Sequence, residues 1–279
     1  MPELPEVQAH CERLTARFAG AVLQRFEPLR FTALKTAWPD PANAKGHALS
    51  EVARRGKYLL ATFGPTTFVV HLMQGGRLKD DMKPDAKPKT AQARWAFEDG
   101  RTWLLTEAGT ERKAGVWCVE TEGRLDSPPL DRLGPDALEL SADALAERFA
   151  SHNMRLHGFL RDQACIAGLG RLLANEICHA ARLSPFAMTG KLGAAGAAAV
   201  VDAIHRCCEE GLAFEREQDN MSSSKERPAA MHNRTGLPCP DCNDTVREVS
   251  YSRYTVNYCP TCQTDGKVLA DNTTSKFLK

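Results

Sequence analysis

The chain has 279 residues, of which 43% are hydrophobic and 25% are charged. This composition is typical of a globular protein and excludes disorder, collagen and coiled coil as descriptions of the whole chain. The 36 Lys and Arg residues nearly balance the 35 Asp and Glu residues, so any basic surface for a nucleic acid must come from local placement of charge.

The first part of the chain is predicted to form one helix followed by strands. An apolar stripe at helical spacing, made of Val7, Cys11, Leu14 and Phe18, predicts a helix over 5–19. The β-rich runs are Val52–Phe63, Thr67–Met73, Arg94–Phe97, Thr102–Leu105 and Gly115–Glu120. Asp99-Gly100 lies between two of these runs and predicts a hairpin turn. We therefore expect residues 1–130 to form an antiparallel β-sandwich or barrel with a helix at its entrance.

After a proline-rich link the pattern becomes helical. The predicted helices are Ala142–Ser151, Leu156–Gln163, Arg171–Leu183 and Ala194–Phe214. The polar segment Glu215–Ala230 predicts a mobile loop. Val246–Tyr251 and Tyr254–Tyr258 predict a short β-hairpin near the end of the chain. These patterns divide the chain into parts at 1–130, 131–230 and 231–279.

Membrane segments are not expected. The longest uncharged stretch, 58–76, is interrupted by Gly64-Pro65, and no apolar run approaches the roughly 20 residues that a membrane helix needs. The first residues lack the basic and then apolar pattern of a signal peptide, so we expect a cytoplasmic protein.

Four of the ten cysteines form two CxxC pairs with 16 residues between them. The pairs are Cys239 with Cys242 and Cys259 with Cys262. Each pair supplies two thiolates from one turn, and two such turns can close a tetrahedron around one Zn²⁺ ion. Four thiolates leave no position for water, so the ion would be structural. A redox pair or two disulfides are the alternatives.

The start of the chain can supply an unusual nucleophile. Removal of Met1 would leave Pro2 with a free secondary amine, which attacks an aldehydic carbon to give an iminium. An α-amino group is partly unprotonated at pH 7, and Glu3 could move the protons that such a reaction needs. The same residue types also suit the first turn of any helix. These residues alone leave both interpretations open.

A cluster of cations lies further along the chain. Arg54, Arg55 and Lys57 fall within a predicted strand, in which alternation places Arg55 and Lys57 on one face and Tyr58 on the other. A cationic face suits contact with phosphates. It also suits a solvated strand edge that is guarded by positive charge.

Several motifs in one order resemble the formamidopyrimidine-DNA glycosylase / endonuclease VIII family. They are Pro2-Glu3-Leu4-Pro5-Glu6-Val7, Arg54-Arg55-Gly56-Lys57-Tyr58-Leu59-Leu60, Leu133-Gly134-Pro135-Asp136, Ala167-Gly168-Leu169-Gly170 with Ala174-Asn175-Glu176, Arg234-Thr235-Gly236 and Cys259-Pro-Thr-Cys262-Gln263. The resemblance spans the whole chain. It implies an α+β multidomain fold with an N-terminal β-sandwich, a helix–two-turns–helix domain and a C-terminal zinc-finger β-hairpin.

The resemblance also implies an activity. The family members are bifunctional DNA glycosylases and AP lyases, which flip an oxidised base out of the duplex, excise it through a Schiff base and cut the strand by β,δ-elimination. By position, the catalytic residues are Pro2 as the nucleophile, Glu3 as the general acid/base on the sugar, and Lys57, which contacts phosphate beside the lesion and assists catalysis. Glu6 matches a second family glutamate, although it also suits the first helical turn. The expected partner is damaged DNA, and we expect a monomer.

The DNA contacts that the resemblance implies fall on Arg55, Gln74, Arg112, Arg171, Asn175 and Arg253. Arg253 lies one residue too far from Cys259, so Arg247 is a rival for the arginine of the finger. His157 stands where the family has a phosphate-binding lysine, and Arg155 or Arg161 could replace it. Arg171 stands where the family has an asparagine.

Two further departures concern the wedge that fills the space left by the flipped base. Gln74 stands where the family typically has a methionine, and Ala114 where it has a phenylalanine. A missing aromatic wedge means less stacking on the remaining bases. Two alternatives therefore stay open: an enzyme restricted to abasic sites or single-stranded lesions, and an inactive protein that binds damage.

Overall fold

The computed structural model describes residues 1–81, 83, 86–108, 112–222, 226–251 and 254–269. The chain forms two compact units. The first contains Met1–Leu133 and Glu215–Ser223, and the second contains Gly134–Phe214 and Ser224–Lys279. The division into three parts that the sequence suggests stays a prediction. None of the described helices is long and apolar enough to span a membrane.

The first unit is an antiparallel β-sandwich with one helix, α1 (Leu4–Phe18). Its strands are β1 (Leu23–Pro28), β2 (Leu49–Arg55), β3 (Tyr58–Phe63), β4 (Thr66–His71), β5 (Gly76–Asp80), β6 (Ala91–Phe97), β7 (Thr102–Glu107) and β8 (Gly115–Glu120). One sheet has the order β1-β6-β7-β5 and the other β2-β3-β4-β8. A single buried cluster joins both sheets to α1, where Phe18 packs on Phe97 and Trp103 at centroid distances of 5.3 and 5.0 Å. The predicted sandwich and entrance helix are confirmed.

The prediction of one strand over Val52–Phe63 was wrong. The chain reverses at Gly56-Lys57, and β2 pairs with β3 as a hairpin in which Arg55 lies opposite Tyr58. Gly56 has a φ of +57°, a conformation that favours glycine and permits a two-residue turn. Lys57 therefore lies in the turn, and the alternation argument for its side chain does not apply. The hairpin predicted at Asp99-Gly100 is confirmed by the pairing of β6 with β7.

Strands β1 and β5 were not predicted, and both have weak sequence signals. β1 contains charged residues and a proline, and β5 is a short, partly charged strand. Each lies at an edge of its sheet, where one side of the strand has no strand neighbour. Edge strands need little apolar alternation, which explains why the pattern missed them.

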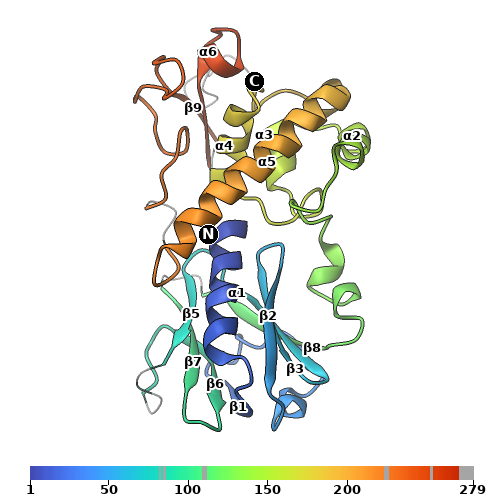
Figure 1. Ribbon diagram of the computed structural model, residues 1–279, viewed down its shortest axis with the longest axis vertical. Coiled ribbons are helices and arrows are strands. Elements are labelled where there is room, and N and C mark those ends of the chain that lie inside the picture. The colour runs from blue at the N-terminus through green and yellow to red at the C-terminus, as the bar shows by residue number, and fades with distance from the viewer. Residues whose placement is uncertain (82, 84–85, 109–111, 223–225, 252–253, 270–279) are drawn as a thin grey trace. The chain divides into compact units, whose positions relative to one another are not determined.

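The second unit contains the helices and a small hairpin. Its helices are α2 (Ala142–Ser151), α3 (Leu156–Arg161), α4 (Arg171–Ala180), α5 (Gly193–Arg216), whose last two residues belong to the first unit, and α6 (Pro260–Gln263). The hairpin consists of β9 (Arg247–Ser250) and β10 (Thr255–Tyr258), which pair antiparallel. Figure 1 shows α4 beside α3 and the finger hairpin near α6. The predicted helical region and hairpin are confirmed, with ends shifted by up to three residues.

The polar segment after α5 returns to the first unit. The guanidinium of Arg13 in α1 donates to the carbonyls of Glu215 and Gln218 at 2.7 and 3.2 Å. Arg216 makes a bidentate pair with Glu12, both bonds being 2.8 Å long. Met221 joins the buried cluster of the sandwich. The start of the segment that was predicted as a mobile loop is thus anchored on α1.

Candidate DNA-binding and catalytic site

The N-terminal residues form a capping box at the start of α1. The backbone N–H of Glu3 donates to the Glu6 carboxylate at 2.9 Å, and the Glu3 carboxylate lies against the backbone N–H of Glu6 in return. Glu3 and Glu6 are 5% and 2% exposed, and Pro2 is also buried. The helix therefore begins at Leu4, with Glu3 as its N-cap directly after Pro2, and both glutamates stabilise that start.

The contacts of α1 with β2 bring the turn that carries Lys57 toward this helix end. Thr15 bonds the backbone of Val52, Cys11 approaches the carbonyl of Ala53, and Gln8 accepts from Arg54 at 3.1 Å. In these three contacts, residues closer to the N-terminus of α1 pair with residues of β2 that are closer to Gly56. Figure 1 shows α1 lying along β2. This direction of packing points the Gly56-Lys57 turn toward the end of α1 that begins with Glu3 and Leu4.

His71, at the end of β4, lies beside Lys57 and was not predicted. Burial, together with the nearby charge of Lys57, lowers the pKa of His71 to about 4. Its ring lies tilted against that of Tyr58 with the centroids 4.6 Å apart, and its Nδ1 accepts from the backbone N–H of Met73 at 3.1 Å. Neutral His71 therefore carries its proton on Nε2, which can donate to an anion. A histidine at a strand end next to Gly-rich turn residues was the only signal in the sequence.

The two segments expected to carry the wedge lie side by side. The N–H of Ala108 donates to the carbonyl of Gly75 at 3.3 Å, which joins the turn of Gln74 to the segment before Arg112. Gln74 is exposed and Arg112 is half-buried. Ala114 is fully buried, with its N–H held by the Glu107 carboxylate at 2.6 Å. The side chain of Ala114 therefore offers no wedge.

Arg171 and Asn175, both on α4, have different surroundings. Arg171 is exposed at the first turn of α4, where a DNA contact is feasible. Asn175 is completely buried, and its amide contacts His232 at 3.0 Å and the side chain and backbone of Asn257 at 3.4 and 3.3 Å. The DNA contact implied for Asn175 does not fit this burial, because its polar atoms bind inside the protein.

His157 on α3 is also buried. Burial, followed by the charge of Arg161, lowers the pKa of His157 to about 3, so the ring is neutral at pH 7. The ring of His157 stacks on that of Tyr254. The guanidinium of Arg161 lies 4.0 Å from the centroid of the same Tyr254 ring. Arg155 instead donates to the hydroxyl of Tyr251 at 2.6 Å. Arg247 is exposed on β9, whereas Arg253 lies outside the described residues.

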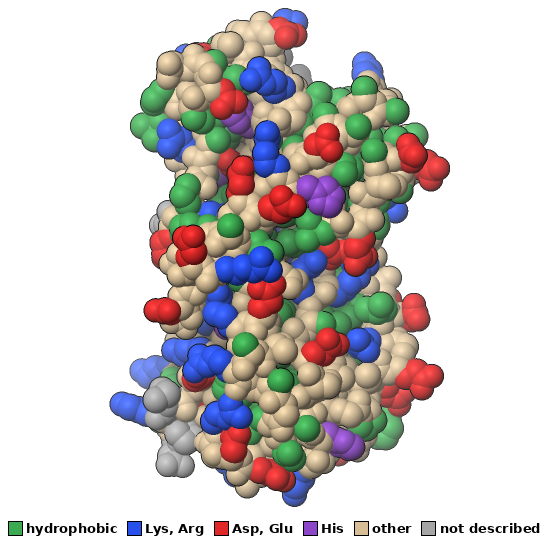
Figure 2. Space-filling model, in the orientation of Figure 1, with side chains coloured by type: hydrophobic (Ala, Val, Ile, Leu, Met, Phe, Trp, Pro, Cys, Tyr) green, Lys and Arg blue, Asp and Glu red, His purple; other side chains and the backbone are tan. Residues whose placement is uncertain are grey.

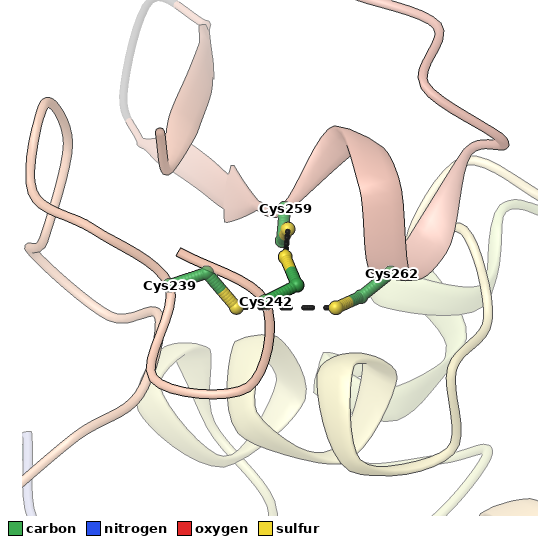
Figure 3. Close-up of side chains that lie close together, drawn as sticks. All are labelled: Cys239, Cys242, Cys259 and Cys262. Atoms are coloured by element: carbon green, nitrogen blue, oxygen red, sulfur yellow. Dashed lines mark hydrogen bonds between the residues drawn. The ribbon is translucent and has the colours of Figure 1, made fainter. Parts of the chain in front are cut away.

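The four cysteines converge as expected. Figure 3 shows their sulfurs pointing toward one centre, from the loop before β9 and from the start of α6. The Sγ–Sγ distances are 3.9 Å for Cys239–Cys262 and 3.4 Å for Cys242–Cys259. A Zn–S length of about 2.3 Å gives tetrahedral sulfur separations of about 3.8 Å, close to these values. Disulfides need about 2.05 Å, so the donor set fits a metal ion.

On the face shown in Figure 2, surface charge alone does not mark a DNA-binding region. Basic and acidic side chains are mixed over the face shown in Figure 2. This mixture agrees with the formal net charge of +1.

Two protein-family models match the chain. The formamidopyrimidine-DNA glycosylase N-terminal domain matches residues 1–116, and the formamidopyrimidine-DNA glycosylase H2TH domain matches residues 133–223. A formamidopyrimidine-DNA glycosylase of Symbiobacterium thermophilum is 31% identical over 94% of this chain and 89% of its own length. An uncharacterized formamidopyrimidine-DNA glycosylase-like protein of Mycobacterium tuberculosis is 43% identical over 55% of this chain and 98% of its own length.

The fold has a solved counterpart. The formamidopyrimidine-DNA glycosylase of Lactococcus lactis, bound non-covalently to DNA with an AP site, superimposes with a TM-score of 0.83 at 19% identity. The match covers 94% of this chain and 99% of that one. The fold and the domain matches together define a DNA repair glycosylase. The chain belongs to the formamidopyrimidine-DNA glycosylase family, which confirms the resemblance seen in its motifs.

Proposed function

We propose that the protein is a bifunctional DNA glycosylase and AP lyase that acts on oxidised bases. The observation that carries this proposal is the packing of α1 along β2, which directs Lys57 and His71 toward the end of the helix that holds Pro2 and Glu3. Nucleophilic attack on a sugar that is flanked by phosphates requires an amine, a carboxylate, a cation and a neutral hydrogen-bond donor.

In the proposed reaction, loss of Met1 frees the nitrogen of Pro2. This nitrogen forms a bond to C1′ of the damaged nucleotide while the glycosidic bond breaks and its electron pair leaves with the base. The nitrogen lone pair then expels O4′, which takes up a proton, and the ring opens to give an iminium that acidifies C2′. Loss of the C2′ proton expels the 3′ phosphate, and a second elimination expels the 5′ phosphate. Glu3 moves the protons, and Lys57 and the Nε2–H of His71 hold phosphate oxygens.

Borohydride trapping tests the amine. Full-length protein with Met1 removed, confirmed by mass spectrometry, is mixed with duplexes that carry an abasic site or an oxidised base. We expect a covalent adduct on residue 2. Pro2→Leu, which favours retention of Met1, should lose that adduct. Absence of any adduct with processed wild type would refute the lyase.

We further propose that the phosphate contact expected at position 157 is made by Arg161. His157 is buried and neutral, and Asn175 has a structural role in place of a DNA contact. Among the described residues no carboxylate pairs with Arg161, so its charge is available to phosphate, whereas Arg155 is held by Tyr251. Arg55, Gln74, Arg112 and Arg171 stay proposed DNA contacts, as do the rivals Arg247 and Arg253.

The burial of Ala114 favours a second candidate, an enzyme for abasic sites or single-stranded lesions. Without an aromatic wedge, the space left by a flipped base is filled less well, and a duplex offers less advantage. Excision rates on matched duplex and single-stranded oligonucleotides distinguish the two candidates. A strong preference for 8-oxoguanine opposite cytosine in a duplex would exclude the narrower one. If Glu3→Gln and the wild type both bind damage and neither cuts, the inactive binding protein is correct.

We also propose that the four-cysteine cluster holds one structural Zn²⁺ ion. The ion would clamp the loop before β9 to the start of α6 and so hold the finger hairpin in shape. The ion takes no part in the bond-breaking steps, since four sulfurs complete its coordination. Metal analysis of the purified protein should find one zinc per chain.

A further inference from the structure

His179, near the end of α4, lies directly against the four-cysteine cluster. It is 4% exposed, and its Nε2 is 3.4 Å from the Sγ of Cys239. The same nitrogen is 3.7 Å from a carboxylate oxygen of Asp241. With the proposed metal ion bound, both neighbours of Nε2 are acceptors, because a metal-bound thiolate and a carboxylate carry no hydrogen. The proton of the neutral ring therefore sits on Nε2 and points at them.

A cavity borders His179. Its volume is about 430 Å³, and His179, Asp241 and Arg206 are among the residues that line it. The sulfur of Cys239 is not in its lining, and Cys239 is fully buried. His179 thus lines the cavity and also lies against the sulfur of Cys239.

The second cysteine pair is tied to α4 by a different side chain. Gln263 accepts from the backbone N–H of Cys259 at 2.8 Å and donates to the carbonyl of Leu183 at 3.0 Å. His179 and Leu183 lie at and just beyond the end of α4. Each CxxC pair is therefore connected to one end of the same helix by one polar side chain.

We propose that His179 is a positioning residue for the metal site, which donates an N–H···S hydrogen bond to Cys239. The inference rests on the proposed zinc site. Four thiolates around one divalent ion leave a net charge of −2, and a buried donor to one sulfur offsets part of it. Partners of metal ligands typically change metal affinity by about 10- to 100-fold when they are removed.

Three variants of the full chain distinguish the hydrogen bond that His179 donates from the space that its side chain fills. His179→Phe fills the space without a donor, His179→Gln keeps a donor, and His205→Phe removes a helical histidine on α5 as the control. Zinc affinity is measured by competition with a chromophoric chelator. We expect the dissociation constant to rise about 10- to 100-fold for His179→Phe. His179→Gln should stay within a few-fold of wild type, and the control should not change.

A Co²⁺-substituted protein tests whether His179 is instead a ligand. The d–d bands should have the energies and intensities of tetrahedral cobalt with four thiolates in both wild type and His179→Phe. A shift of these bands would show direct ligation and overturn the proposal, as would an unchanged zinc affinity in His179→Phe. If phenylalanine does not fit, His179→Met removes the donor with less change in volume. Wild type without any metal would instead refute the zinc site itself.

Discussion

Single residues of this protein combine structural and proposed chemical roles. Glu3 closes the capping box of α1 with Glu6 and is also the proposed acid/base. Replacement of Glu3 therefore affects both helix stability and chemistry, and Glu3→Gln is the most informative change because an amide oxygen can still accept from the backbone. Lys57 and Arg161 lack this ambiguity, since neither caps a helix, and their charges are best tested through the salt dependence of DNA binding.

Lys57→Met should reduce excision about 10- to 100-fold, because a charged hydrogen bond to phosphate contributes about 1.5–3 kcal/mol. The slope of log K against log salt for duplex binding should become shallower by about 0.9. Single-turnover excision and titrations at several salt concentrations measure the two effects. Lys45→Met is the control, because Lys45 is an exposed lysine that follows the short helical turn Pro41–Ala44. This change should alter neither the excision rate nor the salt slope.

Arg161→Ala should likewise make the salt slope shallower by about 0.9, whereas Arg161→Lys should keep it. Arg155→Ala should keep the slope, since its guanidinium is bound to Tyr251. The same titrations compare the three variants. If Arg155→Ala lowers the slope and Arg161→Ala does not, the two roles are reversed.

At the scale of elements, turns and buried polar contacts position the site. Lys57 lies in the turn between β2 and β3. The hydrogen-bond network of Asn175, His232 and Asn257 joins α4 to β10. Glu176 adds to this connection, because its carboxylate accepts from the N–H groups of Ala230 and His232 at 2.6 and 2.8 Å. The family motif at Asn175-Glu176 thus serves to hold the segment that leads into the finger.

Gly56→Ala should destabilise the protein by about 1–2 kcal/mol, because a side chain at a φ of +57° is strained. Gly158→Ala is a matched control within α3, where an added Cβ meets no atom within 4 Å. This second change should stabilise the helix by up to about 1 kcal/mol. Urea unfolding of both variants measures the difference. Equal effects at the two positions would contradict the assigned turn.

At the scale of the whole molecule, each unit contains a deeply buried histidine that is expected to make the protein acid-sensitive. In the first unit, burial lowers the pKa of His10 to about 4, although its bond to the Leu78 carbonyl acts in the opposite direction. In the second unit, burial lowers the pKa of His157 to about 3. Both values lie below the unfolded value of about 6.5. Between these values the unfolded chain binds more protons than the folded one.

The free energy of unfolding should therefore be highest above about pH 6.5 and fall as the pH drops toward 4. Each of the two histidines contributes about 1.4 kcal/mol per pH unit within that range. His10→Gln and His157→Gln should each reduce the pH dependence of the free energy of unfolding by the equivalent of about one bound proton. Urea unfolding between pH 5 and 7 measures this change. His47→Gln, at an exposed histidine, is the control. An unchanged slope in both buried variants would rule out this source of acid sensitivity.

The sequence by itself determined the features that depend on short spacing. The apolar stripe of α1 and the two CxxC pairs are local patterns, and each imposes its geometry within a few turns of chain. The order of the motifs was enough to identify the family. Only the tertiary structure decided that Lys57 lies in a turn, that His71 lies beside it and that Asn175 and Ala114 are buried. The contact of His179 with Cys239 joins residues 60 positions apart. Such positions depend on packing between distant segments, and the free energy of that packing leaves no periodic signal in either segment.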